Sequence, residues 1–228
     1  MSPADSPVLL SLYVGGLVAL LGLPWAVLLG WLLARGRFRG RAILSAAVLT
    51  PMVLPPVVTG LLLLDVFGRT TPVGGWFASV GMPLSFSFAA AVLAALVVGL
   101  PLYVWSARAA FAAVDPRLEE VSLTLGQPPR RTFWRVTLPL ALPGLAGGAV
   151  LAFARGLGEF GATAILAGNV EGETQTIALA VYSLLEMPDG QSATRPLVAA
   201  SVALSLGALV AYEGLVRWQR RRLELDRG

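Results

Sequence analysis

The 228-residue chain contains no cysteine, no histidine and no lysine, and each absence excludes a kind of chemistry. Without cysteine and histidine there is no disulfide framework, no thiolate or imidazole metal site, and no catalysis by either side chain. Without lysine there is no P-loop, because that motif uses a lysine to reach the nucleotide phosphates. Any energy from ATP that this protein uses must therefore come through another chain.

Charged residues are also scarce. They make up 13% of the chain, whereas hydrophobic residues make up 56% and the mean hydropathy is +0.75. A soluble domain of this size carries about 25% charged residues. The composition predicts an integral membrane protein.

Five apolar segments are each long enough to cross the hydrocarbon core as a helix, which takes about 20 residues. The first of them is too long and too apolar, and lacks the basic start, to be a cleavable signal peptide. A sixth stretch, 177–185, is so short that we predict a re-entrant or interfacial helix. The sequence thus predicts an all-α integral membrane protein, a single transmembrane domain over residues 1–228, with spans at approximately 8–34, 42–66, 84–107, 138–157 and 197–216.

The arginines predict the orientation of these spans. Of the 17 arginines, 14 fall in the segments after the first, third and fifth spans. Arg69 and Arg195 fall on the other side, and Arg155 falls inside the fourth span. Because cytoplasmic loops carry the excess of positive charge, we expect the N-terminus outside and the C-terminus inside. The basic run near the C-terminus is then a membrane-edge anchor, and no nucleic-acid partner is expected.

The predicted cytoplasmic loop, residues 115–137, carries signals for two short helices. Asp115 can cap a helix that starts with Pro116, and Gly126 can end it in the left-handed conformation. A second short basic helix is expected over 130–136. The first helix has an apolar face with period 3.6, formed by Leu118, Val121, Ser122 and Leu125.

This loop, EEVSLTLGQPPRRTFWRVTLP, resembles the EAA loop of binding-protein-dependent ABC importer permeases, with the pattern E-A-A-x3-G-x9-I-x-L-P. Glu120, Gly126, Leu138 and Pro139 match in register, and Val136 stands for the isoleucine. The resemblance implies a permease fold of the MetI-like type, in which the loop docks on a cytoplasmic ATPase. It also implies which residues couple the two proteins: Glu119, Glu120, Leu125 and Gly126.

The resemblance further implies how this loop is held. Glu120 is expected to pair with basic groups of the ATPase. The apolar face of Leu118, Val121 and Leu125 is expected to anchor on the membrane helices.

Three further segments, 50–64, 138–163 and 168–186, are similar to the oxyanion branch of these permeases. The string FARGLGEFGAT is shared by molybdate and sulfate permeases, whereas GETQTI and the short chain favour molybdate or tungstate. The resemblance implies import of a tetrahedral oxyanion, molybdate or tungstate first, with sulfate or thiosulfate as the alternative. A secondary transporter is disfavoured because no internal repeat is visible. An ATP-independent channel is disfavoured because it would not need the two-helix cytoplasmic platform.

The resemblance also implies partners. These are cytoplasmic ABC ATPase subunits that bind ATP and magnesium, a periplasmic or lipid-anchored oxyanion-binding protein, and a second copy of this chain. This chain would hold no cofactor, would not be an enzyme by itself, and would lie in a bacterial or archaeal cytoplasmic membrane. A related subunit in place of the second copy stays open.

The prolines of the second span mark a candidate pathway lining. Prolines remove helical hydrogen bonds, and carbonyls freed in this way are tolerated in a membrane only against protein or a water-filled cavity. We therefore take Pro55, Pro56 and Thr59, with Thr163 of the later segment, as candidate lining residues. The alternative is a kinked helix used for packing. The glycines of span four, Gly144 and Gly148, are expected to serve close helix packing.

Arg155 and Glu159 are opposite charges at the end of the fourth predicted span. Their spacing of four residues places them on one helical face, where we expect an ion pair. Arg155 would lie about 25 Å along the helix from the cytoplasmic edge. A structural pair is favoured over a role of Arg155 in attracting the anion.

Overall fold

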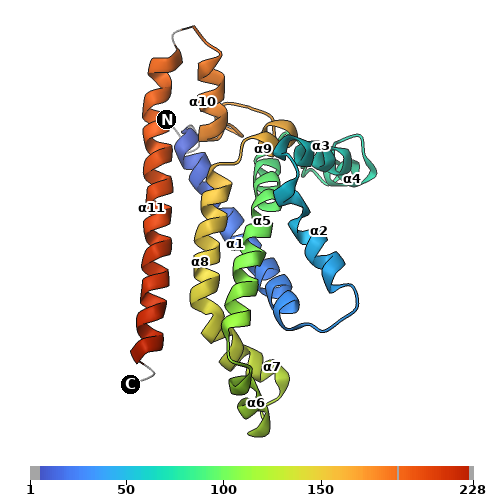
Figure 1. Ribbon diagram of the computed structural model, residues 1–228. Helices are drawn as coiled ribbons and strands as arrows, with labels where there is room; N and C mark the ends of the chain where they lie inside the picture. Colours follow the sequence, from blue (N-terminus) through green and yellow to red (C-terminus); the bar gives the residue numbers. More distant parts are fainter. Residues whose placement is uncertain (1–5, 189, 226–228) are drawn as a thin grey trace.

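The computed structural model describes residues 6–188 and 190–225, with the side chains of 218–225 left aside. All regular elements within these residues are helical (Figure 1). Four helices are long and apolar enough to cross a membrane, and a bent pair of helices makes a fifth candidate. The predicted all-α membrane fold is confirmed.

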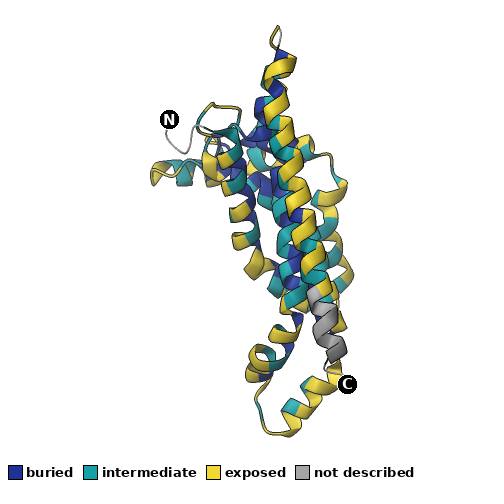
Figure 2. Cartoon of the chain, turned by 90° about the vertical axis from the view of Figure 1, so that its left-hand side faces the viewer, coloured by how far each residue is buried: buried dark blue, intermediate teal, exposed yellow. Residues whose placement is uncertain are grey.

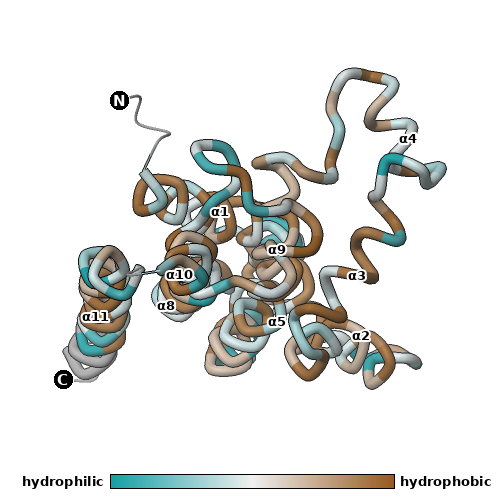
Figure 3. The backbone as a smooth tube through the Cα atoms, turned by 90° about the horizontal axis from the view of Figure 1, so that it is seen from above, coloured by the Kyte–Doolittle hydropathy of each residue, from teal (hydrophilic) through white to brown (hydrophobic). Residues whose placement is uncertain are grey.

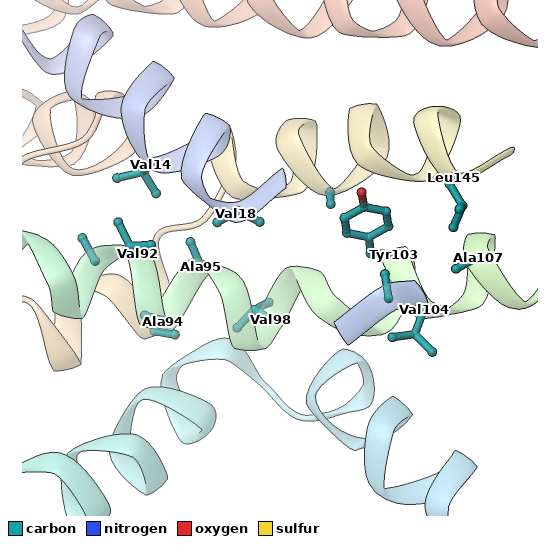
Figure 4. Close-up of a cluster of buried hydrophobic side chains, with 14 of the residues drawn as sticks. Val14, Val18, Val92, Ala94, Ala95, Val98, Tyr103, Val104, Ala107 and Leu145 are labelled. Carbon is teal, nitrogen blue, oxygen red and sulfur yellow. The ribbon is translucent and has the colours of Figure 1, made fainter. Parts of the chain in front are cut away.

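Three long helices form the core: α1 (Pro7–Arg35), α5 (Phe88–Ala113) and α8 (Leu138–Leu157). Their buried residues are mostly alanine and valine, as Figure 4 shows around α5. Small side chains let the backbones approach closely, which is how helices associate where water provides no driving force. A Cβ added to Gly30 would lie 2.6 Å from that of Ala107.

The glycines of α8 serve close helix packing, as predicted, and the contacts that the structure shows lie within the same chain. Gly144 lies against Ala110 of α5, and Gly148 lies against Tyr103 and Ser106. Gly147 faces Tyr212 of α11 (Gly190–Leu225) instead. These glycines hold α8 between α5 and α11.

The predicted second span is broken at prolines that were expected to remove helical hydrogen bonds. It consists of α2 (Arg41–Val53) and α3 (Pro56–Phe67), which meet at an angle of 113°. Leu54 and Pro55 have extended backbone between them. Two successive prolines explain the break, because the residue before a proline is driven out of the helical region.

The remaining short helices gather at the end of the bundle where α3 lies (Figure 1). These are α4 (Pro72–Ser79), α9 (Gly161–Leu166) and α10 (Ile177–Leu185). The last has the bounds predicted for the short re-entrant or interfacial helix. It packs against α1 and α11.

Helix α11 lies at one edge of the bundle. Viewed from above, it stands opposite the α2–α4 segment, with α1, α5 and α8 between them (Figure 3). Most of its described length is exposed (Figure 2). It extends beyond the predicted span at both ends. Arg227, which was counted toward the predicted cytoplasmic side, lies outside the described residues.

The predicted cytoplasmic loop lies at the end of the bundle opposite α3, α9 and α10 (Figure 1). It forms three elements: α6 (Pro116–Thr124), α7 (Pro129–Thr132) and η2 (Phe133–Thr137). The expected second short helix, 130–136, is not a separate element. It runs into α8 through the π-helical turn η2, so that one helical stretch covers Pro129–Leu157.

Candidate functional site

Helix α6 begins and ends as the sequence predicts. Asp115 Oδ1 accepts a hydrogen bond from the Arg117 amide at 2.9 Å, and Pro116 follows the cap. Gly126 has a φ of +80°, and its amide donates to Leu123 O while the Gln127 amide donates to Ser122 O. These two bonds form a Schellman motif, which needs a left-handed residue at the glycine position.

The orientation of α6 is the reverse of the expected one. The predicted apolar face of Leu118, Val121 and Leu125 does not anchor on the membrane helices; it is exposed, Leu125 to 75%. The face toward the bundle is polar instead. Glu119 accepts a hydrogen bond from the Thr137 hydroxyl at 2.8 Å, and Ser122 shares one with Thr132 at 2.9 Å.

The predicted coupling residues therefore separate into two groups. Glu120, Leu125 and Gly126 are exposed. They lie on or directly after α6, at the end of the bundle opposite α9 and α10 (Figure 1). Glu119 is half-buried and bound within the chain. Exposed leucine and valine beside a carboxylate form a surface suited to contact with another protein.

Near α6, aromatic side chains of α1, α5 and η2 contact one another. Phe133 of η2 makes edge contacts with Trp31 of α1 at 5.7 Å and with Trp134 at 5.5 Å between ring centroids. It also stacks with Phe111 of α5 at 6.2 Å. Sequence reasoning missed these residues. No local spacing signals this cluster, because its side chains come from three distant segments of the chain.

The candidate pathway residues lie on two helices that pack together, α3 and α9. A Cβ added to Gly60 would meet the Ala162 backbone at 2.9 Å, and Gly161 lies against Pro56. Thr59 and Thr163 are 4% and 1% exposed, and both hydroxyls are buried without a hydrogen-bond partner.

Burial of these threonines means that the α3–α9 contact is closed in this conformation. Pro55, in contrast, is exposed at the start of α3. Within the broken span it is thus α3, through Pro56 and Gly60 near its N-terminal end, that packs against α9.

Arg155 and Glu159 form the expected ion pair, with 2.8 Å between Nη1 and Oε2. The Glu159 side chain is 1% exposed and the Arg155 side chain 32%. The other carboxylate oxygen of Glu159 accepts a hydrogen bond from the Ala162 amide at 2.9 Å. The pair therefore connects the end of α8 to the first turn of α9.

No group of three or more acidic, histidine or cysteine side chains that could hold a metal ion occurs among the described residues. The described residues contain two candidate functional features. One is an exposed helix at one end of the bundle, and the other is a closed, partly polar helix contact at the other end.

Comparison with known proteins identifies this arrangement. Residues 26–225 match the family described as "Binding-protein-dependent transport system inner membrane component". The chain is 45% identical over 224 residues to the molybdenum transport system permease protein ModB of Escherichia coli K12, with 96% of each chain covered. The corresponding protein of Haemophilus influenzae is 42% identical, again with 96% of each covered. The sulfate transport system permease protein CysW of Synechocystis is 34% identical, over 85% of this chain and 70% of that protein.

Solved structures share the fold. The inward-facing MetNI methionine ABC transporter has a chain that superposes with a TM-score of 0.68 at 21% identity, covering 93% of this chain and 92% of that one. A chain of a bacterial ABC transporter that imports alginate gives a TM-score of 0.67 at 20% identity, covering 93% and 77%. This chain therefore belongs to the binding-protein-dependent inner membrane components, the permeases of ABC importers.

Proposed function

We propose that this permease carries molybdate, or the chemically similar tungstate, into the cytoplasm. The observation that supports the proposal best is the 45% identity to a molybdenum permease over 96% of both chains. The identity to a sulfate permease is lower and covers less of the chain. Both kinds of substrate are doubly charged tetrahedral oxyanions, which is why sulfate or thiosulfate is the second candidate.

We further propose that the whole chain acts as one permease domain whose α6 surface receives a separate cytoplasmic ATPase. The exposed Glu120, Val121 and Leu125 supply a carboxylate and apolar side chains on one side of α6. The chain has no P-loop lysine of its own, which supports a separate source of ATP hydrolysis. With α6 in the cytoplasm, the C-terminus lies inside and the N-terminus outside.

A second copy of this chain is proposed to complete the pathway. Helices α2 and α3 leave many large apolar side chains exposed, including Ile43, Met52, Val53 and Leu62. Some of these surfaces face lipid, but five spans are few to enclose a gated path. We propose that α3 and α9 line that path, and that Thr59 and Thr163 become accessible when the two helices separate.

The test is uptake by the permease reconstituted with its ATPase and its oxyanion-binding protein. We expect uptake of radioactive molybdate that requires ATP and is inhibited by tungstate far more than by sulfate. Equal inhibition by sulfate, with uptake of labelled sulfate, would assign the chain to the second candidate. Uptake that continues with an ATPase variant unable to hydrolyse ATP would indicate a channel.

A further inference from the structure

Four elements of the bundle meet at one ion pair between Arg35 and Glu119. Arg35 is the last residue of α1, and Glu119 lies on the bundle-facing side of α6. Their Nη2 and Oε1 atoms are 3.4 Å apart. Arg35 Nη2 also donates a hydrogen bond to Val114 O at 2.6 Å, where α5 ends, and Glu119 Oε1 accepts one from Thr137 of η2 at 2.8 Å.

This pair is shielded enough to matter energetically. Arg35 and Glu119 side chains are 20% and 23% exposed, and Thr137 is buried. Partial burial lowers the local dielectric, so the attraction exceeds that of a surface pair. The carbonyl of Val114 lies at a helix end, where acceptors lack intrahelical partners, and Arg35 supplies one.

The contact is also incomplete in this conformation. The Nε of Arg35 is buried without a partner. The distance of 3.4 Å exceeds the 2.7–2.9 Å of a charge-assisted hydrogen bond. A small shift of α6 toward α1 would let both Nε and Nη2 bind the carboxylate in the two-bond geometry that arginine favours. The buried Nε is therefore available for a second contact with the carboxylate.

The neighbouring backbone is suited to such a shift. Thr137 is the last residue of the π-helical turn η2, which leads directly into α8. Turns of this kind are rare and often occur at functional sites. A movement of Glu119 thus acts on α1 through Arg35 and on α8 through Thr137.

We propose that Arg35 is a positioning residue that, through Glu119 and Thr137, transmits displacement of α6 to the membrane helices α1 and α8. This inference rests on the proposed function, because it requires an ATPase that displaces α6. Glu119 is then a link inside the permease, whereas its neighbour Glu120 faces the partner.

The experiment compares Arg35→Gln, Glu119→Gln and the double variant in the reconstituted complex. Three quantities are measured: binding of the ATPase, the rate of ATP hydrolysis, and the number of anions imported per ATP. We expect ATPase binding and hydrolysis to stay within about twofold, and anions per ATP to fall about tenfold in each single variant. The double variant should lose no more than one single variant, because the two residues act as a unit.

Two further variants make the result specific. Arg35→Lys keeps the positive charge but lacks the planar guanidinium group, and it should recover part of the loss in anions per ATP. The control is Arg217→Gln with Glu213→Gln, an exposed pair on α11 at 3.9 Å, which should change nothing. If Arg35→Gln reduces the amount of protein in the membrane, Thr137→Val is the second variant: it replaces the hydroxyl that binds Glu119 with a methyl group of similar size and should still lower anions per ATP.

Unchanged anions per ATP in Arg35→Gln and Thr137→Val would overturn the inference. Loss of ATPase binding in Glu119→Gln would overturn it too, since Glu119 would then face the partner. Failure of the proposed function looks different: the unmodified complex itself would show no uptake that depends on ATP.

Discussion

Substitutions at the ion pair of Arg155 and Glu159 test quantitatively whether this pair stabilises the fold. Arg155→Ala removes the partner at 2.8 Å and leaves a carboxylate that is 1% exposed, with the Ala162 amide as its remaining hydrogen-bond donor. Breaking a buried pair costs about 3–5 kcal/mol, and we expect about 3 because Arg155 is partly exposed. Glu159→Ala should cost less, about 1–2 kcal/mol, because the arginine left behind can reach polar surroundings. The remaining cost arises because one amide loses its acceptor.

The assay is thermal unfolding of the purified permease complex, together with the amount of permease in the membrane. For domains of 150–250 residues each kcal/mol shifts Tm by about 2–4 °C, so Arg155→Ala should lower Tm by about 6–12 °C. Removing both side chains should recover part of the loss. The matched control is the exposed pair of Glu213 and Arg217, whose removal should shift Tm by no more than about 2 °C.

Anion uptake distinguishes the alternative role. If Arg155 guides the anion, Arg155→Ala should accumulate normally, unfold at the parental temperature and transport poorly. Adding Glu159→Ala should then give no rescue. That combination of results would refute the structural interpretation of the pair.

Three other predictions concern the backbone, the packing and the orientation. Gly126→Val should cost about 1–2 kcal/mol and reduce uptake, because position 126 has a left-handed backbone, even though nothing lies within 4 Å of its Cβ position. Gly126→Asn should be tolerated, because asparagine adopts that backbone more readily. Gly30→Ala should destabilise the α1–α5 contact by about 1–3 kcal/mol, while Gly16→Ala, which meets open space, should not. Both effects are measured by Tm. A Tm of Gly30→Ala equal to that of the parent would contradict the packing prediction. A cysteine at Thr70 should react with an impermeant reagent from outside and one at Gln127 should not; labelling of Gln127 would reverse the proposed orientation.

Properties that depend on neighbours in sequence were predictable. The bounds of α8 and α10 follow from runs of apolar residues, and the ends of α6 follow from Asp115 and Gly126. Hydropathy, capping and left-handed glycines act within a few residues, so the sequence is enough to place them. The close packing of Gly144 and Gly148 belongs to the same class, because small residues four apart form a surface that another helix can approach.

The face of α6 that contacts the bundle was not predictable in this way. Periodicity identified an apolar face, and burying that face on the protein was the natural expectation. The structure buries Glu119 instead, because Arg35 and Thr137 reach the same point from distant parts of the chain. No spacing along the sequence joins these three residues.

The sequence by itself thus determined a membrane protein with its helices, the short helix between Asp115 and Gly126, and its ion pair at positions 155 and 159, since each follows from local composition and helical geometry. The prolines at 55 and 56 explain where the second span breaks, but only the tertiary structure decided the 113° angle between α2 and α3, the closed contact of Thr59 and Thr163, and the inward side of α6. These features depend on which helices become neighbours. That choice is made by packing among α1, α5, α8 and α9, where close approach at glycines and matching polar groups decide which contacts form.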